Sequence, residues 1–362
     1  MASFAARPAA RCVLARALLL LPCGAAPQEA PDPARRAADA NAPHRGTQEP
    51  WAPFTVAPER LHAAGDAAPL PADGDWMIGV EFDGVARAWP LTLIASHEVV
   101  NDVVGEVAVA VTWCVTCQAP VVFRRDLDGQ RLTFGNAREA WRASLLLYDV
   151  ETQTRWVQAS GIAHAGPLEG RFLETLPSVV VEWASWRADH PQSQWVDGSD
   201  ELTLRRAGDD RERLFLFDER GLDSMGVVLR DGAEARLLPL RVLEQKTLWK
   251  ERVGEQPLVA IYSVKHRLLH AYDARVDGIE LDFELVRDAD GRPLELREKG
   301  GARRWSIATG KALVAPGASA VAPLRRLIAY PLRKGRFKDH FPGGTLATGG
   351  PTSAPPPKRA GN

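Results

Sequence analysis

Short apolar runs separated by turn residues fill the chain from residue 74 to residue 342. Two runs meet at Asp83-Gly84 and two more at Asp231-Gly232, and both residue types tolerate the positive φ of a tight hairpin turn. Pro90 opens a short helix over residues 90–99, because proline suits the first helical turn. Further strands are predicted at residues 107–113, 121–125, 131–134 and 145–148, with a hairpin across Asp128-Gly129, and residues 179–188 begin as a strand and end as an amphipathic helix near His190-Pro191.

The same order of signals occurs twice. Each pair in the following set is 149 residues apart: Pro90 and Pro239, Val104-Gly105 and Val253-Gly254, Asp128-Gly129 and Asp277-Gly278, Trp156 and Trp305, Ser160-Gly161 and Thr309-Gly310. A constant register over so long a stretch indicates an internal duplication. The predicted fold is therefore β-rich α+β, with strands, hairpins and short helices in two pseudo-symmetric copies.

The ends of the chain differ from this repeated part. Residues 1–26 predict an export signal, with a basic start, an apolar run and then small residues. Residues 27–73 predict a disordered Ala/Pro-rich linker, and residues 343–362 a disordered tail. Between them we expect a first module at residues 74–200 and a diverged second module at residues 201–342.

The apolar segments are too short to cross a bilayer, which takes about 20 apolar residues. We therefore expect no transmembrane helix. Cys23, after Leu20-Leu21, indicates a lipoprotein cleavage site, although the preceding Pro22 is unfavourable for one. Cleavage after Ala26 would instead discard that cysteine. The expected location is periplasmic, extracellular or an outer-surface lipoprotein.

Charge and composition exclude some partners. The chain has 362 residues with 45 Lys and Arg against 46 Asp and Glu, so nothing favours nucleic-acid binding. Its 45% hydrophobic and 25% charged content is that of a globular protein. Four cysteines are too few for a disulfide scaffold. A small-molecule partner is not identified by the sequence.

Cys114 and Cys117 are the sharpest candidates for chemistry. If the chain turns after Cys114, the two thiolates can bind a soft or borderline metal such as copper or zinc. They can also cycle between dithiol and disulfide, or form a plain structural disulfide. In the second copy Ser263 and His266 occupy the corresponding positions, so the common fold does not require the cysteines.

His97 and Asp149 are further candidates. Zinc proteases carry a second histidine four residues after the first, but here Asn101 stands at that position, which excludes this motif. His97 can instead complete a Cys₂His metal set with an open position, or be a histidine bonded to backbone. Asp149 aligns with Glu298 and is predicted as an acid–base group, with a local turn as the alternative.

Several of these motifs resemble a known family. His97-Glu-Val-Val-Asn-Asp102, Trp113-Cys-Val-Thr-Cys117 and the segment Trp183 to His190-Pro191 resemble the uncharacterised bacterial family numbered 3179 among domains of unknown function. The resemblance covers residues 78–195, and residues 225–342 look like a diverged copy. It implies kinship of fold and export, but no reaction. The family has glycine after the second cysteine, where this chain has Gln118.

We therefore expect an exported, duplicated protein whose first module carries a metal or thiol site. The metal ligands would be Cys114, Cys117 and His97, with Asp149 as an acid–base group. The alternative is a non-catalytic extracytoplasmic binding or structural module in which the cysteines are bridged or inert. The sequence does not decide whether the protein is an enzyme.

Overall fold

Strands supply most of the regular structure, and short helices connect them, so the molecule is β-rich α+β as the pattern predicts. The computed structural model describes residues 44–45, 49–66, 71–203, 213–315 and 319–347. These residues fall within one compact unit, Pro43–Asn362. The predicted export signal and lipid-anchor cysteine, Cys23, lie outside the described residues.

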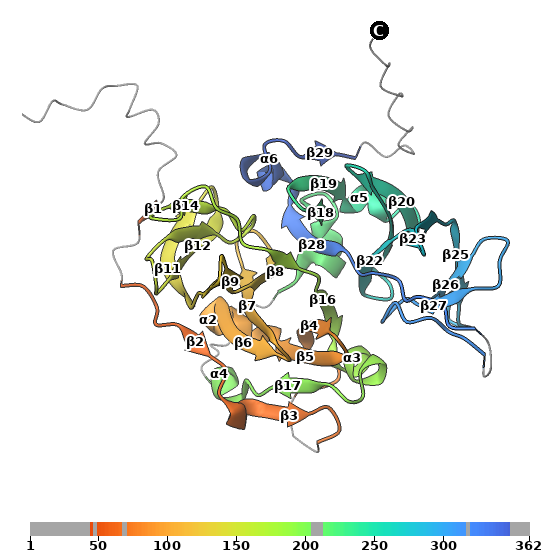
Figure 1. Ribbon diagram of the computed structural model, residues 1–362, viewed down its shortest axis with the longest axis horizontal. Coiled ribbons are helices and arrows are strands. Elements are labelled where there is room, and N and C mark those ends of the chain that lie inside the picture. The colour runs from red at the N-terminus through yellow and green to blue at the C-terminus, as the bar shows by residue number, and fades with distance from the viewer. Residues whose placement is uncertain (1–43, 46–48, 67–70, 204–212, 316–318, 348–362) are drawn as a thin grey trace, which may run out of the picture. The chain divides into compact units, whose positions relative to one another are not determined.

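Three five-stranded sheets hold most of the first module (Figure 1, red to green). The first has the order β1 (His44–Arg45), β11 (Phe134–Trp141), β12 (Ser144–Asp149), β13 (Arg155–Val157), β14 (Ala163–Ala165). The second is β15 (Thr175–Leu176), β8 (Ala119–Arg124), β7 (Val107–Cys114), β6 (Val99–Val104), β2 (Phe54–Thr55). The third is β16 (Val179–Glu182), β4 (Trp76–Phe82), β5 (Val85–Pro90), β17 (Gln194–Val196), β3 (Leu61–Ala63). A two-stranded ribbon, β9 (Asp126–Leu127) and β10 (Gln130–Arg131), and the helices η1 (Pro58–Arg60), α2 (Leu91–His97), α3 (Trp183–Asp189) and α4 (Ser199–Thr203) complete it.

The second module follows a similar element order (Figure 1, cyan to blue). Its four-stranded sheet has the order β28 (Ile328–Arg333), β18 (Met225–Asp231), β19 (Glu234–Pro239), β29 (Thr345–Leu346). Two three-stranded sheets are β20 (Leu248–Val253), β21 (Gln256–Ser263), β22 (Leu268–Asp273) and β25 (Phe283–Arg287), β26 (Pro293–Glu298), β27 (Arg304–Ser306). The ribbon β23 (Arg275–Val276) and β24 (Ile279–Glu280) lies between them in sequence, and the helices are η2 (Phe215–Phe217), η3 (Glu219–Gly221), α5 (Leu240–Leu243), η4 (Lys334–Arg336) and α6 (Phe337–His340).

Tight turns and helix ends follow from local sequence. Asp83 and Gly84 both have positive φ, 48° and 83°, and link β4 to β5 in a two-residue turn. Pro90 caps α2, and Glu98 ends it in the left-handed region at φ 59°, donating its backbone N–H to Ile94. This ending points His97 and Glu98 out of the helix at the start of β6.

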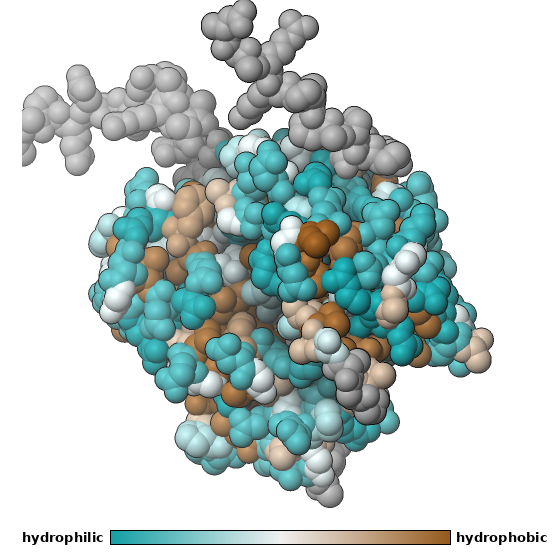
Figure 2. All heavy atoms as spheres, turned by 45° about the vertical axis from the view of Figure 1, so that its right-hand side comes forward, coloured by the Kyte–Doolittle hydropathy of each residue, from teal (hydrophilic) through white to brown (hydrophobic). Residues whose placement is uncertain are grey.

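The two modules share a hydrophobic core. One buried cluster contains Ile78 and Trp113 of the first module together with Val227 and Tyr262 of the second. Separating the two modules would therefore expose part of this cluster to water. Buried apolar surface stabilises a fold by about 25 cal/mol per Å², so the separation would be unfavourable. The face in Figure 2 is mainly hydrophilic, with hydrophobic residues in separate patches.

Three predicted boundaries were wrong. Residues 54–63, placed in the linker, form β2, η1 and β3, because Phe54 and Leu61 bring apolar side chains to sheet edges that need a partner strand. The hairpin across Asp128-Gly129 is confined to β9 and β10, since β8 pairs with β7 and Phe134 starts another sheet. The tail prediction began too early, because β29 pairs with β19.

Candidate functional site

The turn between β7 and β8 brings Cys114 and Cys117 together. Cys114 ends β7, and its Cα lies 5.5 Å from that of Cys117, with the two sulfurs at disulfide distance. Gln118 donates its backbone N–H to the Cys114 carbonyl over 2.7 Å and has φ 58°. Left-handed backbone suits glycine, and a glutamine that adopts it is strained.

One of the two cysteines lines an open pocket. Cys117 is fully buried, and its sulfur lies 3.7 Å from the Gln158 side-chain oxygen. Cys114 is also nearly buried, but it lines an open pocket of about 450 Å³. A molecule in the pocket would therefore meet Cys114 before Cys117.

The rim of this pocket carries backbone strain. Glu98, Arg138 and Ala143 line it, and all three have positive φ, between 56° and 63°. Left-handed backbone at non-glycine residues is uncommon, and such strain gathers at functional sites. The clustering around Cys114 therefore marks this pocket as a candidate site.

Polar groups in the pocket are held in fixed positions. The Glu98 carboxylate accepts a 2.6 Å hydrogen bond from the Asn136 amide. The Arg138 guanidinium lies 5.3 Å from the centre of the Trp51 ring, a cation–π arrangement. The pocket thus presents the Glu98 and Glu139 carboxylates and the Arg138 cation beside the cysteine pair.

Residues of the second module donate hydrogen bonds to the turn that carries the cysteines. Arg333 in β28 donates its backbone N–H to the Cys117 carbonyl over 3.1 Å and its Nε to the Thr116 carbonyl over 2.6 Å. Phe215 donates its backbone N–H to the Gln118 side-chain oxygen over 2.9 Å. The position of the pair therefore depends on both modules.

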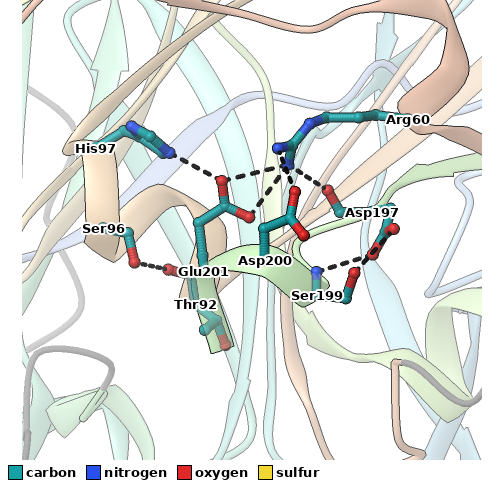
Figure 3. Close-up of polar contacts among 8 residues, drawn as sticks. All are labelled: Arg60, Thr92, Ser96, His97, Asp197, Ser199, Asp200 and Glu201. Carbon is teal, nitrogen blue, oxygen red and sulfur yellow. Dashed lines mark hydrogen bonds and ion pairs between the residues drawn. The ribbon is translucent and has the colours of Figure 1, made fainter. Parts of the chain in front are cut away.

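His97 has a different partner from the one predicted. Its Nε2 lies 3.1 Å from Oε1 of Glu201 (Figure 3). Its ring also stacks on Phe54, with centroids 4.1 Å apart. Arg60 donates to both oxygens of Glu201 and to Asp200. The cluster ties η1, α2 and α4 together.

The carboxylate of this cluster is buried but well paired. Burial would raise the pKa of Glu201, but hydrogen bonds from His97 and Arg60 outweigh it and lower the pKa below the ordinary 4.5. A lowered folded-state pKa stabilises the protein above the unfolded value, and that stability is lost as the pH falls through the folded pKa.

We expect Glu201→Gln to lower the free energy of unfolding by about 1–3 kcal/mol at neutral pH, because the amide cannot pair with Arg60. The deficit should shrink as the pH falls below 4.5, where the wild-type carboxylate is protonated too. Urea unfolding at several pH values measures it. The matched control is Asp200→Asn, whose side chain is 81% exposed on the same arginine, with an expected loss of about 0.5 kcal/mol or less. Equal losses in the two variants would contradict the assignment.

The predicted three-ligand set does not form. Across the described ranges, no group of three or more His, Cys, Asp or Glu side chains could hold a metal ion. Cys114 and Cys117 are brought together, while the Nε2 of His97 faces Glu201. The two sulfurs alone are thus the donors the structure offers at the turn.

Asp149 lies in a local network instead of the pocket. Its carboxylate accepts bonds from the Thr152 backbone N–H (2.5 Å), the Thr152 hydroxyl (2.9 Å) and Trp156 Nε1 (2.8 Å). The side chain is fully buried. These bonds shape the turn after β12 and fix Trp156, so its acid–base role stays a prediction.

Asp149→Asn tests that role. We expect a loss of about 1–3 kcal/mol in unfolding free energy, because the amide turns a donor toward groups that need an acceptor. The rate at which dithiothreitol reduces Cys114–Cys117 in the folded protein should not change. Asp128→Asn, a half-exposed surface carboxylate, is the control for stability. A slowed reduction with unchanged stability would instead show an acid–base function.

Sequence reasoning missed the residues that surround Cys114. Trp51 was assigned to the linker, and Arg138 carried no motif. Both come from segments far from the cysteines in sequence, and only sheet pairing brings them to one rim. The one available signal was Glu98, inside the string that also contains His97.

In the part of the chain that is described, no helix combines the length and apolar character needed to cross a bilayer. A family model described as "Protein of unknown function (DUF3179)" matches residues 55–332, which spans both modules. No curated protein and no solved structure matches the chain.

Proposed function

Because the chain belongs to the DUF3179 family, whose description assigns no reaction, we propose from its own residues that it is an extracytoplasmic thiol–disulfide protein acting through Cys114 and Cys117. The observation that carries the proposal is the paired cysteines on one turn, of which Cys114 alone lines the pocket. Such asymmetry suits exchange, in which one sulfur is attacked and the other leaves.

The exchange proceeds through two successive thiolate attacks. A substrate thiolate attacks the Cys114 sulfur, the Cys114–Cys117 bond breaks, and Cys117 leaves as a thiolate that takes a proton from water. A second substrate thiolate attacks the substrate sulfur of the mixed disulfide and releases Cys114. The products are a substrate disulfide and a protein dithiol, so two electrons pass from substrate to protein. In reverse, the dithiol reduces a substrate disulfide.

The turn supplies groups suited to both thiols. The Cys117 backbone N–H lies 3.3 Å from the Cys114 sulfur, and a donor there favours negative charge on that sulfur. The Gln158 side-chain oxygen can accept the S–H of Cys117. Gln158 is itself fixed, because its amide donates 2.8 Å bonds to Thr112 and to the Ala119 carbonyl.

The proposal includes an internal duplication in which only the first copy carries the chemistry. The His266 backbone N–H donates to Ser263 over 3.2 Å, in the place of the Cys117–Cys114 contact. Arg267, which corresponds to Gln118, also has positive φ, at 51°. The edge-on ring pair Phe283–Trp305 repeats Phe134–Trp156. These matches support a common frame whose second turn has lost, or never gained, its thiols.

A second candidate is a soft-metal site on the reduced pair. Two thiolates on one turn fit two-coordinate Cu(I), which prefers sulfur ligands. They do not by themselves fit zinc, which takes three or four protein ligands, and the described residues add no third ligand of the usual kinds. Cys114 and Cys117 would hold the ion, and the bound metal would supply electron transfer or copper delivery.

The experiment is a redox titration of the folded full-length protein in dithiothreitol buffers, with the Cys114–Cys117 peptide followed by mass spectrometry. We expect reversible reduction with the fold retained and a midpoint above about −300 mV, since structural disulfides lie below that value. A pair that resists reduction until the protein unfolds would leave only a structural disulfide. Reduced protein that takes up one equivalent of Cu(I), but not after Cys114→Ser, would support the second candidate.

The expected location is outside the cytoplasm, as the residue 1–26 pattern predicts. An oxidising compartment keeps such a pair available as a disulfide, whereas the cytosol would hold it reduced. Fractionation of cells that produce the full chain measures this, and a cytoplasmic pool of uncleaved protein would overturn it.

A further inference from the structure

A cleft separates the first module from the second on the side of α3. Two adjoining pockets of about 260 and 330 Å³ share Val179, Trp186 and His190 as walls. The opposite wall comes from the second module, from the β26 region and the loop that precedes β28. Ligand sites favour such boundaries between modules. This cleft shares no lining residue with the pocket at Cys114.

Two arginines in the cleft have only neutral hydrogen-bond partners. Arg292 donates to the Ser185 hydroxyl over 3.3 Å. Arg326 bonds to His270 Nδ1 over 2.8 Å and also to the Ala308 carbonyl. Within the described residues, neither guanidinium has a carboxylate at ion-pair distance. A guanidinium held in a cleft without a counter-ion is a ready site for a bidentate oxyanion.

The other cations of the cleft are already neutralised. Lys311 pairs with Glu81 over 2.9 Å, and Arg267 pairs with Glu182. Glu295 lines the cleft too but pairs with Arg304 over 3.1 Å, so among the described residues Asp189 is the carboxylate of the cleft without an ion pair. Burial raises the pKa of Asp189 against the opposing charges of Arg292 and Arg326. Even with Asp189 ionised, the four cations Lys311, Arg267, Arg292 and Arg326 exceed the three carboxylates Glu81, Glu182 and Asp189 by one positive charge.

Two histidines in the same cleft are held neutral. His190 stacks on Trp186 with centroids 4.0 Å apart, and its Nδ1 lies 3.4 Å from Glu81. Burial lowers the pKa of His190 to about 4. Burial also lowers the pKa of His270 well below its ordinary value, and the charges of Arg326 and Arg292 add to this. Neutral imidazoles can donate one hydrogen bond each without adding charge.

From the cleft and its two guanidiniums without a carboxylate partner among the described residues, we infer that the boundary between the modules binds a small oxyanion, a carboxylate or phosphoryl group, between Arg292 and Arg326. The oxyanion supplies the negative charge that the described residues do not. His190 and His270 then add hydrogen bonds that fix its orientation. This inference stands independently of the thiol site, because its residues are separate.

The test is NMR of the imidazole groups of the full chain, titrated separately with inorganic phosphate and with citrate. The chain has eight histidines, so the signals of His190 and His270 can be identified with His190→Gln and His270→Gln variants. We expect those two signals to move with a saturable dependence on anion. Tighter binding of phosphate assigns a phosphoryl ligand, and tighter binding of citrate a carboxylate. Absence of saturable shifts with both anions overturns the inference.

Arg292→Gln is the deciding variant, since Arg292 lies at the surface of the cleft and its loss leaves the Arg326 contacts intact. We expect its Kd for the preferred anion to rise about tenfold or more, because it loses a charge-assisted bond. Arg292→Lys should recover part of the affinity. The matched control is Arg241→Gln, an exposed arginine paired with Asp223 outside the cleft. Equal weakening in Arg292→Gln and Arg241→Gln would mean general charge attraction and would overturn the site.

Discussion

Cys114→Ser is expected to abolish thiol–disulfide exchange, reducing the rate of substrate thiol oxidation to the uncatalysed background. The reason is that Cys114 is the cysteine that lines the pocket, while Cys117 is fully buried. The remaining Cys117 thiol has no path to a substrate in the folded protein. The measurement is the initial rate of oxidation of a small thiol, with glutathione as the probe.

Cys117→Ser should behave differently, which makes the pair of variants informative. Cys114 can still attack a substrate disulfide, but no second cysteine resolves the product. We expect a mixed disulfide that is stable to gel filtration, with the mass of one bound glutathione on the peptide that contains Cys114. If Cys114→Ser formed the adduct and Cys117→Ser did not, the assigned roles would be reversed.

The two cysteine variants must be shown to remain folded before their exchange rates are compared. Both variants should retain the wild-type circular dichroism and cooperative unfolding, because the turn at Ser263 and His266 forms a comparable N–H bond to a side chain three residues earlier without any cysteine. The loss of a short-loop disulfide costs only about 2 kcal/mol in the chain-entropy account. Ser263→Ala should leave exchange unchanged, and a rate loss there would point to a general effect of the turns.

Asp102→Asn is expected to lower the free energy of unfolding by about 3–5 kcal/mol, the largest stability effect we foresee. The Asp102 carboxylate accepts 2.8 Å and 3.0 Å bonds from Arg87 and from the Trp89 indole N–H. The Arg87 and Asp102 side chains are only 7% and 6% exposed. With the carboxylate gone, the Arg87 guanidinium remains as a buried charge without its counter-ion.

The environment of Arg87 explains why the loss is not easily repaired. Burial raises the pKa of Asp102, and the charge of Arg87 opposes that rise, so each group depends on the other. Arg87 also donates to the Val103 carbonyl over 2.8 Å and to the Gln194 side-chain oxygen over 2.7 Å, but both acceptors are neutral and cannot replace the lost counter-ion. Its Nε is buried and lacks a partner among the described residues. Guanidinium chloride unfolding measures the effect. Asp223→Asn, from the exposed pair with Arg241, should cost about 0.5 kcal/mol or less, and similar values for both would refute the argument.

Local signals predicted much of the fold. The Asp83-Gly84 turn, the Pro90 start of α2 and the β7 strand follow from residues adjacent in sequence, and all three occur as expected. Meeting of Cys114 and Cys117 was also expected, because a turn after β7 is a local event. Backbone preference and short-range hydrogen bonds determine such features, so the sequence contains them directly.

The features that the sequence did not predict depend on contacts between residues far apart in the chain. Glu201 lies 104 positions after His97, and no spacing rule connects them. Phe54 looked like part of a linker, although it pairs with β6 and stacks on His97. A polar side chain takes the partner that the sheet arrangement brings near, and this arrangement depends on burial across both modules.

The hydrogen bonds from Arg333 to the cysteine turn connect the reduction potential of the Cys114–Cys117 pair to the docking of the two modules. If reduction changes how well the turn accepts those bonds, then docking must change the reduction potential by the same free energy, since coupling is reciprocal. A tenfold change in docking would shift a two-electron midpoint by about 30 mV. A partner that binds the second module would therefore shift the reduction potential of the cysteine pair without contacting either sulfur atom.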